Sequence, residues 1–334
     1  MSKEYWQIAA GSSGRDYADR FIRHGIAFVG GDNHIATMRQ VADGDIIILK
    51  RGLYEIFAVG EVVQRNGAHR GENDKEWLRD FDGWDLPAYC YVSWRVPTTP
   101  LRTDGLTRTT IQRTPQDKHR TLADSLLPLP VQPIEPEPEP TNQIADEQIL
   151  EFMISQGLRP SAADELTNTV RKIRLLAHYY HQDCYWDDVR EHETRTFLVI
   201  PLLLALGWAE QQMKIELPCS GGRIDVACFQ RPYQRKNEEC VVLIETKDFG
   251  SGLDYAPEQA RRYAADFPAC KVLVVTNGWC YKTFIRVQET GLFNEKPSAY
   301  LNLLKPRDRY PLDPQHTEGA LGVMKWLLPS SLRI

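Results

Sequence analysis

The sequence of 334 residues contains no long apolar run. None of its segments approaches the about 18 consecutive apolar residues that a membrane-spanning helix requires. Its beginning, MSKEYWQIAAGSSGRD, lacks the basic and then apolar plan of a secretory signal peptide. We therefore expect a protein that stays in the cytoplasm and does not enter a membrane.

Cysteine pairs with metal-binding spacing are also missing. The seven cysteines are odd in number, none belongs to a Cys-x-x-Cys pair, and most lie within apolar or strand-like runs. This pattern predicts reduced, packed thiols and not a zinc site.

The chain has no excess of positive charge. Its 40 Lys and Arg residues are outnumbered by 45 Asp and Glu residues, which gives a formal net charge of −5. Binding to a polyanion normally rests on clustered Lys and Arg, so any surface for nucleic acid must be built locally. With 42% hydrophobic and 25% charged residues, the composition is globular, and the length suffices for two domains.

Proline alternates with glutamate over residues 127–143, LPLPVQPIEPEPEPTNQ, where no packing period survives. Such a run favours extended polyproline II and behaves as a semi-rigid spacer. The sequence therefore predicts a first domain over residues 1–126, a linker over 127–145 and a second domain over 146–334.

In the first domain, short segments rich in β-forming residues are separated by Gly and Asp turns. They are YWQIAA, IAFVGG, DIIILKR and IFAVGEVV. Helical patterns over 13–25 and 33–44 lie between them. We expect a small β-barrel or strongly bent sheet with inserted helices.

In the second domain, helical and strand patterns alternate, which predicts a mixed central sheet flanked by helices. Helices are expected over about 146–157, 162–182, 188–206 and 256–267, and strands near 213–217, 223–229, 240–246, 271–278 and 281–287.

Two of these strands each deliver a carboxylate. Asp225 lies within GGRIDVACFQ, and Glu245 follows the apolar run VVLI. Because strand residues alternate between faces, Glu245 and Lys247 project to the same side. Asp225 can face them from the neighbouring strand of a hairpin.

Two carboxylates that converge at the end of a buried hairpin repel each other unless a cation neutralises them. Mg²⁺ suits this need, since it takes oxygen ligands and commonly uses only one or two protein carboxylates together with substrate phosphate. The metal ligands expected from this hairpin are Asp225, Glu245 and Thr246, with Mn²⁺ as a substitute for Mg²⁺. Lys247 would orient an attacking water or offset developing negative charge.

The order Asp225, spacer, Glu245-Thr246-Lys247 resembles the PD-(D/E)XK nuclease superfamily, although the proline of that name is absent. This resemblance implies a restriction-endonuclease-like α/β fold and hydrolysis of phosphodiester bonds. The upstream segment REHETRTFLVIPLLLALGW resembles the first helix of the nuclease domain of type I restriction subunits, which supplies a further acid to the metal site in that family.

Glu191 and Glu193 compete for this role. At 100° per residue, Glu191 falls about 50° from the centre of the apolar helix face, whereas Glu193 falls about 150° away. Helix geometry therefore favours Glu191.

Downstream, Gln259 and Tyr263 are four residues apart and hence on one helix face. The pair resembles the Gln-x-x-x-Tyr motif of RecB-like and type I restriction nucleases, in which it helps to orient the active site and the DNA.

The segment VADGDIIILKRGLYEIFAVGEVV, together with YWQIAAG, resembles the EVE-like and YTH-like branch of the PUA superfamily. These small β-barrels bind RNA or flipped, modified bases. Aromatic residues would stack on the base, and carboxylates would accept hydrogen bonds from an exocyclic amine. The candidates for base recognition are Trp6, Trp77, Trp84, Asp16, Asp32 and Asp82. Trp77 and Trp84 lie in a polar stretch where a loop could expose them.

The leading hypothesis is a modification-dependent restriction or antiphage endodeoxyribonuclease, with the barrel reading a modified base in DNA. The alternatives are a restriction or repair nuclease that recognises unmodified sequence or structure, and a nucleic-acid-binding adaptor that has lost catalysis. Cleavage of both DNA strands would favour a symmetric homodimer. The apolar C-terminal segment over 319–334 suits either a dimer interface or a closing core helix.

Overall fold

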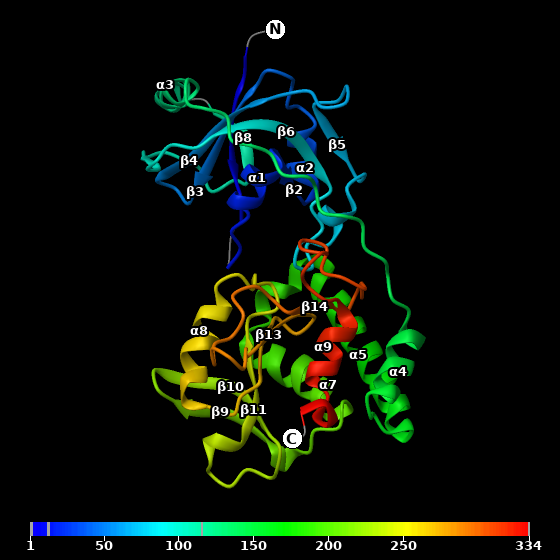
Figure 1. Ribbon diagram of the computed structural model, residues 1–334. Helices are drawn as coiled ribbons and strands as arrows, with labels where there is room; N and C mark the ends of the chain where they lie inside the picture. Colours follow the sequence, from blue (N-terminus) through cyan, green and yellow to red (C-terminus); the bar gives the residue numbers. More distant parts are fainter. Residues whose placement is uncertain (1–2, 12–13, 115, 333–334) are drawn as a thin grey trace. The chain divides into compact units, whose positions relative to one another are not determined.

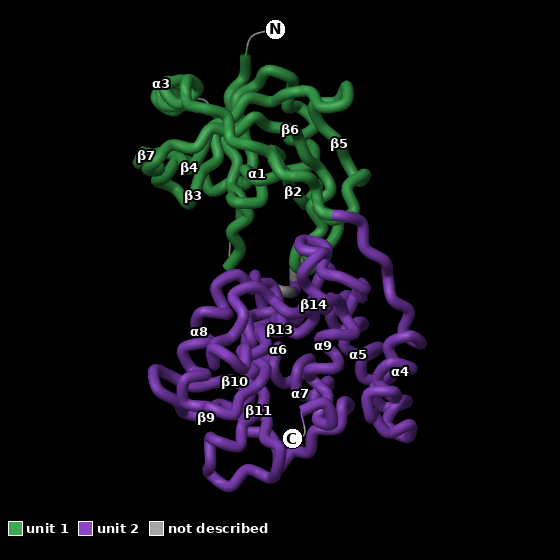
Figure 2. Tube along the Cα trace, viewed as in Figure 1, with its two compact units in different colours: residues 1–138 green, residues 139–334 purple. Residues whose placement is uncertain are grey.

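The computed structural model describes residues 3–11, 14–114 and 116–332. The chain forms two compact units, Met1–Pro138 and Glu139–Ile334 (Figure 2). This division falls inside the segment rich in proline and glutamate.

Unit 1 is built on a mixed sheet that curls into a half-barrel (Figure 1). Its strands are β1 (Tyr5–Ala9), β2 (Ile26–Val29), β3 (Ile46–Arg51), β4 (Glu55–Val62), β5 (Arg70–Glu72), β6 (Ala88–Arg95), β7 (Leu101–Arg102) and β8 (Ile111–Arg113). The main path runs β2-β6-β4-β3-β1-β8, with β1 and β3 parallel and the other neighbours antiparallel. A register shift between Leu49 and Lys50 interrupts the β3–β4 ladder, and such irregularities bend a sheet.

Among the residues of unit 1 that the structure describes, three α-helices accompany this sheet. They are α1 (Ala18–His24), α2 (Asp32–Met38) and α3 (Asp117–Leu126). The first two correspond to the helical patterns expected between the strands. Helix α3 was not predicted from the sequence, and its Ala123 and Leu126 pack against Ile46 and Ile48 of β3.

The segment predicted as a linker has no helix or strand between residues 130 and 142, as expected for an extended run. It is nevertheless attached to each unit in turn. Glu135 donates its N–H to the carbonyl of Arg23, and Glu137 pairs with Lys75 in unit 1. In unit 2, Asn142 is hydrogen-bonded to Asp308. The spacer is therefore shorter than the sequence suggests.

Unit 2 is a six-stranded mixed sheet with helices on both faces. Its strands are β9 (Met213–Cys219), β10 (Gly222–Phe229), β11 (Cys240–Thr246), β12 (Val272–Thr276), β13 (Cys280–Ile285) and β14 (Ala299–Asn302). They follow the order β14-β13-β12-β11-β10-β9, with only β11 and β12 parallel. The five predicted strands appear as β9 to β13, and β14 was not anticipated.

Helix α8 (Ala256–Tyr263) lies on one side of this sheet, and α5 (Ala163–His181), α7 (Ile200–Ala205) and α9 (Ala320–Leu327) lie on the other (Figure 1). Helix α4 (Asp146–Ser155) packs beside α5 and α9. In α9, Val323, Met324 and Leu327 are buried, so this segment is a closing core helix.

The helix predicted over 188–206 is divided. Helix α6 (Glu191–Thr194) continues into a π-helical segment, Arg195–Val199, and then into α7. Pro201 explains the irregular turn, because proline donates no backbone hydrogen bond and its ring opposes the carbonyl four residues earlier. The wider turn shifts the side chains that precede it around the helix axis.

Six cysteines have described side chains, and all are reduced thiols, of which Cys219 alone is partly exposed. Cys184 lies outside the described side chains. Among the helices that the structure describes, none has the length and apolar character needed to cross a membrane.

Candidate functional site

The site lies where β10 and β11 bring their polar residues together. The ladder pairs Val226 with Ile244, and one step further it places Asp225 opposite Glu245. Strand β11 is buried throughout because it is a central strand covered on both faces. Glu245, at its end, is only 2% exposed. The apolar run that forms the strand therefore delivers a carboxylate into the interior.

Asp225 is held from two sides. Its Oδ2 accepts hydrogen bonds from Thr246, 2.6 Å from the backbone nitrogen and 2.8 Å from Oγ1. Its Oδ1 accepts a third from Nη1 of Arg195 at 2.8 Å. Thr246, expected as a metal ligand, thus acts in this structure as a donor that orients Asp225.

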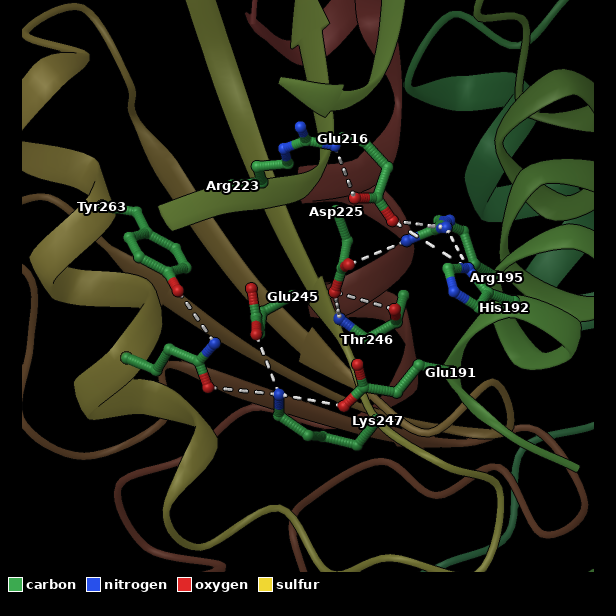
Figure 3. Close-up of polar contacts among 11 residues, drawn as sticks. Glu191, His192, Arg195, Glu216, Arg223, Asp225, Glu245, Thr246, Lys247 and Tyr263 are labelled. Carbon is green, nitrogen blue, oxygen red and sulfur yellow. Dashed lines mark hydrogen bonds and ion pairs between the residues drawn. The ribbon is translucent and has the colours of Figure 1, made fainter. Parts of the chain in front are cut away.

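Lys247 lies at the centre of a second group of contacts (Figure 3). Its Nζ is 2.8 Å from Oε1 of Glu245, 3.2 Å from Oε1 of Gln259 and 3.3 Å from Oε1 of Glu191. Gln259 donates from Nε2 to the hydroxyl of Tyr263 at 3.0 Å. The six residues named as catalytic from the sequence are therefore drawn together, from α6, β10, β11, the residue that follows β11, and α8.

The two acids of α6 have different roles. Glu191 contacts Lys247 in the site. Glu193 turns back and accepts a hydrogen bond from the backbone nitrogen of Arg190 at 3.1 Å, as a capping residue does at the start of a helix. This geometry agrees with the choice of Glu191.

A glycine allows α8 to approach β10 closely. A Cβ atom at Gly222 would lie 2.7 Å from the hydroxyl oxygen of Tyr263, closer than unbonded atoms tolerate. The absence of a side chain at Gly222 therefore lets Tyr263 reach Gln259.

Burial sets the protonation behaviour of the site. It raises the pKa of Glu245 to about 7, and the charge of Asp225 adds to this effect while the hydrogen bond from Lys247 opposes it. Burial alone would lower the pKa of Lys247, but the hydrogen bond and charge of Glu245, with the charge of Glu191, outweigh it and raise that pKa. A cation would favour the ionised form of Glu245.

The donor set suits a hard cation. Asp225, Glu245 and Glu191 offer carboxylate oxygens, which Mg²⁺ prefers. Oε2 of Glu245 is buried and has no hydrogen-bond partner among the residues described, so it is an acceptor available to a cation. Within the described ranges, no group of three or more His, Cys, Asp or Glu side chains is close enough together to hold a metal ion. Mg²⁺ commonly needs only one or two.

Sequence reasoning missed two charged residues of the site. Arg195 is buried and contacts Asp225, and Glu216 of β9 contacts Arg195 at 2.8 Å. Arg195 lies within the quoted segment REHETRTFLVIPLLLALGW, but the sequence assigned no role to it. Glu216 could have been found from strand pairing, since the β9–β10 ladder pairs the residues on either side of it, Ile215 and Leu217, with Val226 and Ile224, the two neighbours of Asp225.

Unit 1 does not bring its base-recognition candidates together as one exposed set. Trp6 and Trp77 are buried, with Nε1 of Trp6 bonded to Asp45 and Nε1 of Trp77 bonded to Glu137. The expectation that a loop exposes Trp77 is therefore wrong, because the 3-10 turn Glu76–Arg79 turns the indole into the core.

The carboxylate candidates and Trp84 also differ in exposure. Asp82 is buried, Asp32 is exposed at the start of α2, and Trp84 and Asp16 are half-buried. The guanidinium of Arg15, the neighbour of Asp16 in the chain, lies 3.8 Å from the centroid of the Trp84 ring. Among these candidates, Trp84 and Asp16 are therefore connected through Arg15, which contacts the ring of Trp84 and precedes Asp16 in the chain.

No protein-family model, no curated protein and no solved structure significantly matches this chain.

Proposed function

We propose that this chain is a Mg²⁺-dependent endodeoxyribonuclease of the PD-(D/E)XK kind, whose unit 2 adopts a restriction-endonuclease-like fold. The observation that carries the proposal is the placement of Lys247. Its ammonium group lies among oxygens of Glu245, Glu191 and Gln259, while Asp225 is held opposite Glu245. A lysine kept beside converging carboxylates is the arrangement that the resemblance implies.

Each residue has a definite part in this proposal. Asp225 and Glu245 would hold Mg²⁺, which supplies Lewis-acid stabilisation of the charge on the phosphodiester, and Glu191 is the proposed further acid of the site. Lys247 orients the attacking water and offsets negative charge that develops on the phosphate. Gln259 keeps Lys247 in place, and Tyr263 keeps Gln259 in place.

Unit 1, a half-barrel whose sequence resembles PUA-like domains, is the proposed DNA-reading part, and a modified base is its proposed target. Trp84 supports this proposal because its ring is partly accessible and already stacks with the guanidinium of Arg15. Stacking on an aromatic side chain contributes about 1–3 kcal/mol per base. Asp16 supplies a half-buried carboxylate for an exocyclic amine, held in place by hydrogen bonds from Arg51 and from the backbone nitrogen of Ala18.

Cleavage assays test both parts. The full chain is incubated with Mg²⁺, Mn²⁺ or a chelator and with the same DNA carrying unmodified, methylated or hydroxymethylated cytosine. We expect cleavage with either metal ion, none with the chelator, and none by Asp225→Asn or Lys247→Ala. If the parent protein cleaves none of the modified, unmodified, single-stranded and double-stranded substrates, the proposed nuclease activity is refuted. Equal rates on the three DNAs would refute the reading of these modifications.

Double-strand cleavage by one centre per chain calls for a symmetric homodimer. The dependence of the rate on protein concentration tests this, since a dimer assembled on DNA gives a steeper than linear dependence at low concentration.

A further inference from the structure

A buried arginine lies beside the candidate metal site. Arg195 is 5% exposed, and its guanidinium joins two carboxylates: Nη1 contacts Oδ1 of Asp225, and Nη2 contacts Oε1 of Glu216, each at 2.8 Å. A guanidinium presents its donors as a rigid planar fork, which can fix two acceptors relative to each other.

His192 completes this arrangement from the same helical turn (Figure 3). Its Nδ1 lies 2.7 Å from Nη2 of Arg195. A guanidinium has only donors, so Nδ1 is the acceptor in this contact. His192 therefore adds a third acceptor to the two carboxylates around Arg195.

The backbone on both sides of Arg195 is irregular. The residue begins the π-helical segment Arg195–Val199, a kind of turn that often marks functional sites. Glu216 has a φ of 55°. Among the described non-glycine residues with positive φ, it is the one that lies inside a strand. That conformation costs an L-residue about 1–2 kcal/mol, and such strain persists only where other contacts enforce it.

The carboxylate of Asp225 is the group that these contacts restrain. Thr246 restrains Oδ2 and Arg195 restrains Oδ1, so both oxygens are oriented. The positive charge of Arg195 also opposes cation binding at Asp225, and the negative charge of Glu216 compensates for it.

We propose that Arg195 is a positioning residue that orients the carboxylate of Asp225 and sets the affinity of the site for its divalent cation, with Glu216 as its anchor. This inference rests on the proposed function. It assigns opposite effects on metal affinity to Arg195 and Glu216, because the two carry opposite charges next to the same ligand.

The test measures Mn²⁺ dissociation constants of the full chain by calorimetry and single-turnover DNA cleavage at saturating Mn²⁺. Arg195→Met removes the charge and should tighten Mn²⁺ binding about tenfold. Glu216→Gln leaves the arginine charge uncompensated and should weaken binding about threefold. Arg195→Lys keeps the charge but loses the fork, so affinity should stay within about twofold while cleavage falls about 10–100-fold.

Arg223→Gln is the matched control. Arg223 approaches Glu216 from the solvent side at 3.9 Å, and its side chain is largely exposed. We expect its Mn²⁺ affinity to equal that of the parent protein. Circular dichroism and the unfolding midpoint of every variant establish that it is folded.

Equal affinities in the parent, Arg195→Met and Glu216→Gln proteins would overturn the inference. Loss of Mn²⁺ binding in Arg195→Met would do the same, since that result indicates a residue that only maintains the fold. If Arg195→Met does not fold, the Mn²⁺ affinities and cleavage rates of Arg195→Lys and Glu216→Gln test the inference in its place. A parent protein that binds no Mn²⁺ and cuts no DNA refutes the proposed function itself, whereas an active parent with unaffected variants refutes this inference alone.

Discussion

Thr246 donates two hydrogen bonds to a single oxygen of Asp225, one from its backbone nitrogen and one from its hydroxyl group. Thr246 is fully buried and Asp225 almost so. The carboxylate of Asp225 thereby joins the middle of β10 to the end of β11. The orientation of this carboxylate depends on a threonine, a residue type that is common in strands.

Thr246→Val removes the hydroxyl donor while keeping the side-chain shape. A hydrogen bond to a charged group contributes about 1.5–3 kcal/mol, so we expect the free energy of unfolding to fall by about that amount. DNA cleavage should fall as well, because one restraint on Asp225 is lost. Thr246→Ser, which keeps the hydroxyl group, serves as the control. Equal cleavage by the two variants would contradict the role given to Oγ1.

Lys247→Gln should reduce the rate of DNA cleavage by about 100-fold or more, because the ammonium group beside the carboxylates is lost. Mn²⁺ binding should persist, since the carboxylates remain. Lys296→Gln is the control, because Lys296 forms an exposed pair with Asp313 outside the site. Cleavage rates and Mn²⁺ titrations are compared for both variants, and a rate like that of the parent for Lys247→Gln would argue against nuclease activity at this site.

Tyr263 should act through Gln259, because its contact in the site is the hydrogen bond from Nε2 of that residue. Tyr263→Phe is expected to lower cleavage less than Gln259→Met. The double variant should be no slower than Gln259→Met alone, since residues in one network are not additive. Fully additive losses in single-turnover assays would show that Tyr263 has a separate role.

Glu245 gives a pH dependence of known sign. Its pKa of about 7 in the folded protein lies above the ordinary 4.5, so between these values the folded state holds a proton that the unfolded state has lost. The free energy of unfolding of the metal-free protein should therefore fall as pH rises from about 4.5 to about 7, by on the order of 1–3 kcal/mol.

Denaturant unfolding in a chelator measures this dependence. Glu245→Gln, which cannot ionise, should lack that part of it, so the difference between parent and variant isolates Glu245 from other titrating groups. A difference that stays constant from pH 4.5 to pH 7 would contradict the raised pKa.

Trp77 is expected to contribute to the stability of unit 1. Its ring is buried beside His24 and Phe28, and its Nε1 donates to Glu137 at 3.2 Å. Trp77→Phe loses this hydrogen bond and leaves unfilled volume, so the free energy of unfolding should fall by about 1–3 kcal/mol. Tyr54→Phe, at an exposed ring, is the control and should be neutral. Thermal unfolding of both variants tests the difference.

Local patterns in the sequence were sufficient for much of unit 2. Apolar runs predicted β9 to β13 because buried strands and helices have distinct periods. The spacing of Glu245 and Lys247 predicted a shared face, and the four-residue spacing of Gln259 and Tyr263 predicted another. Helix geometry selected Glu191 over Glu193, and both contacts agree with that choice.

Contacts between distant segments decided what the sequence left open. Trp77 lies in a polar stretch, yet a turn of 3-10 helix and the distant Glu137 bury it. Helix α3, which was not predicted from the sequence, packs its Ala123 and Leu126 against β3.

The candidate centre shows the same division. Its acids and lysine follow from residue type and from spacing within single strands and one helix. Arg195 does not, because it contacts Asp225 from a π-helical segment that the sequence pattern does not indicate, and Glu216 becomes visible only through the β9–β10 register. Residue identity and periodicity thus determined which charged groups are available. Only the pairing of strands and the packing of helices decided which of these groups form ion pairs with one another.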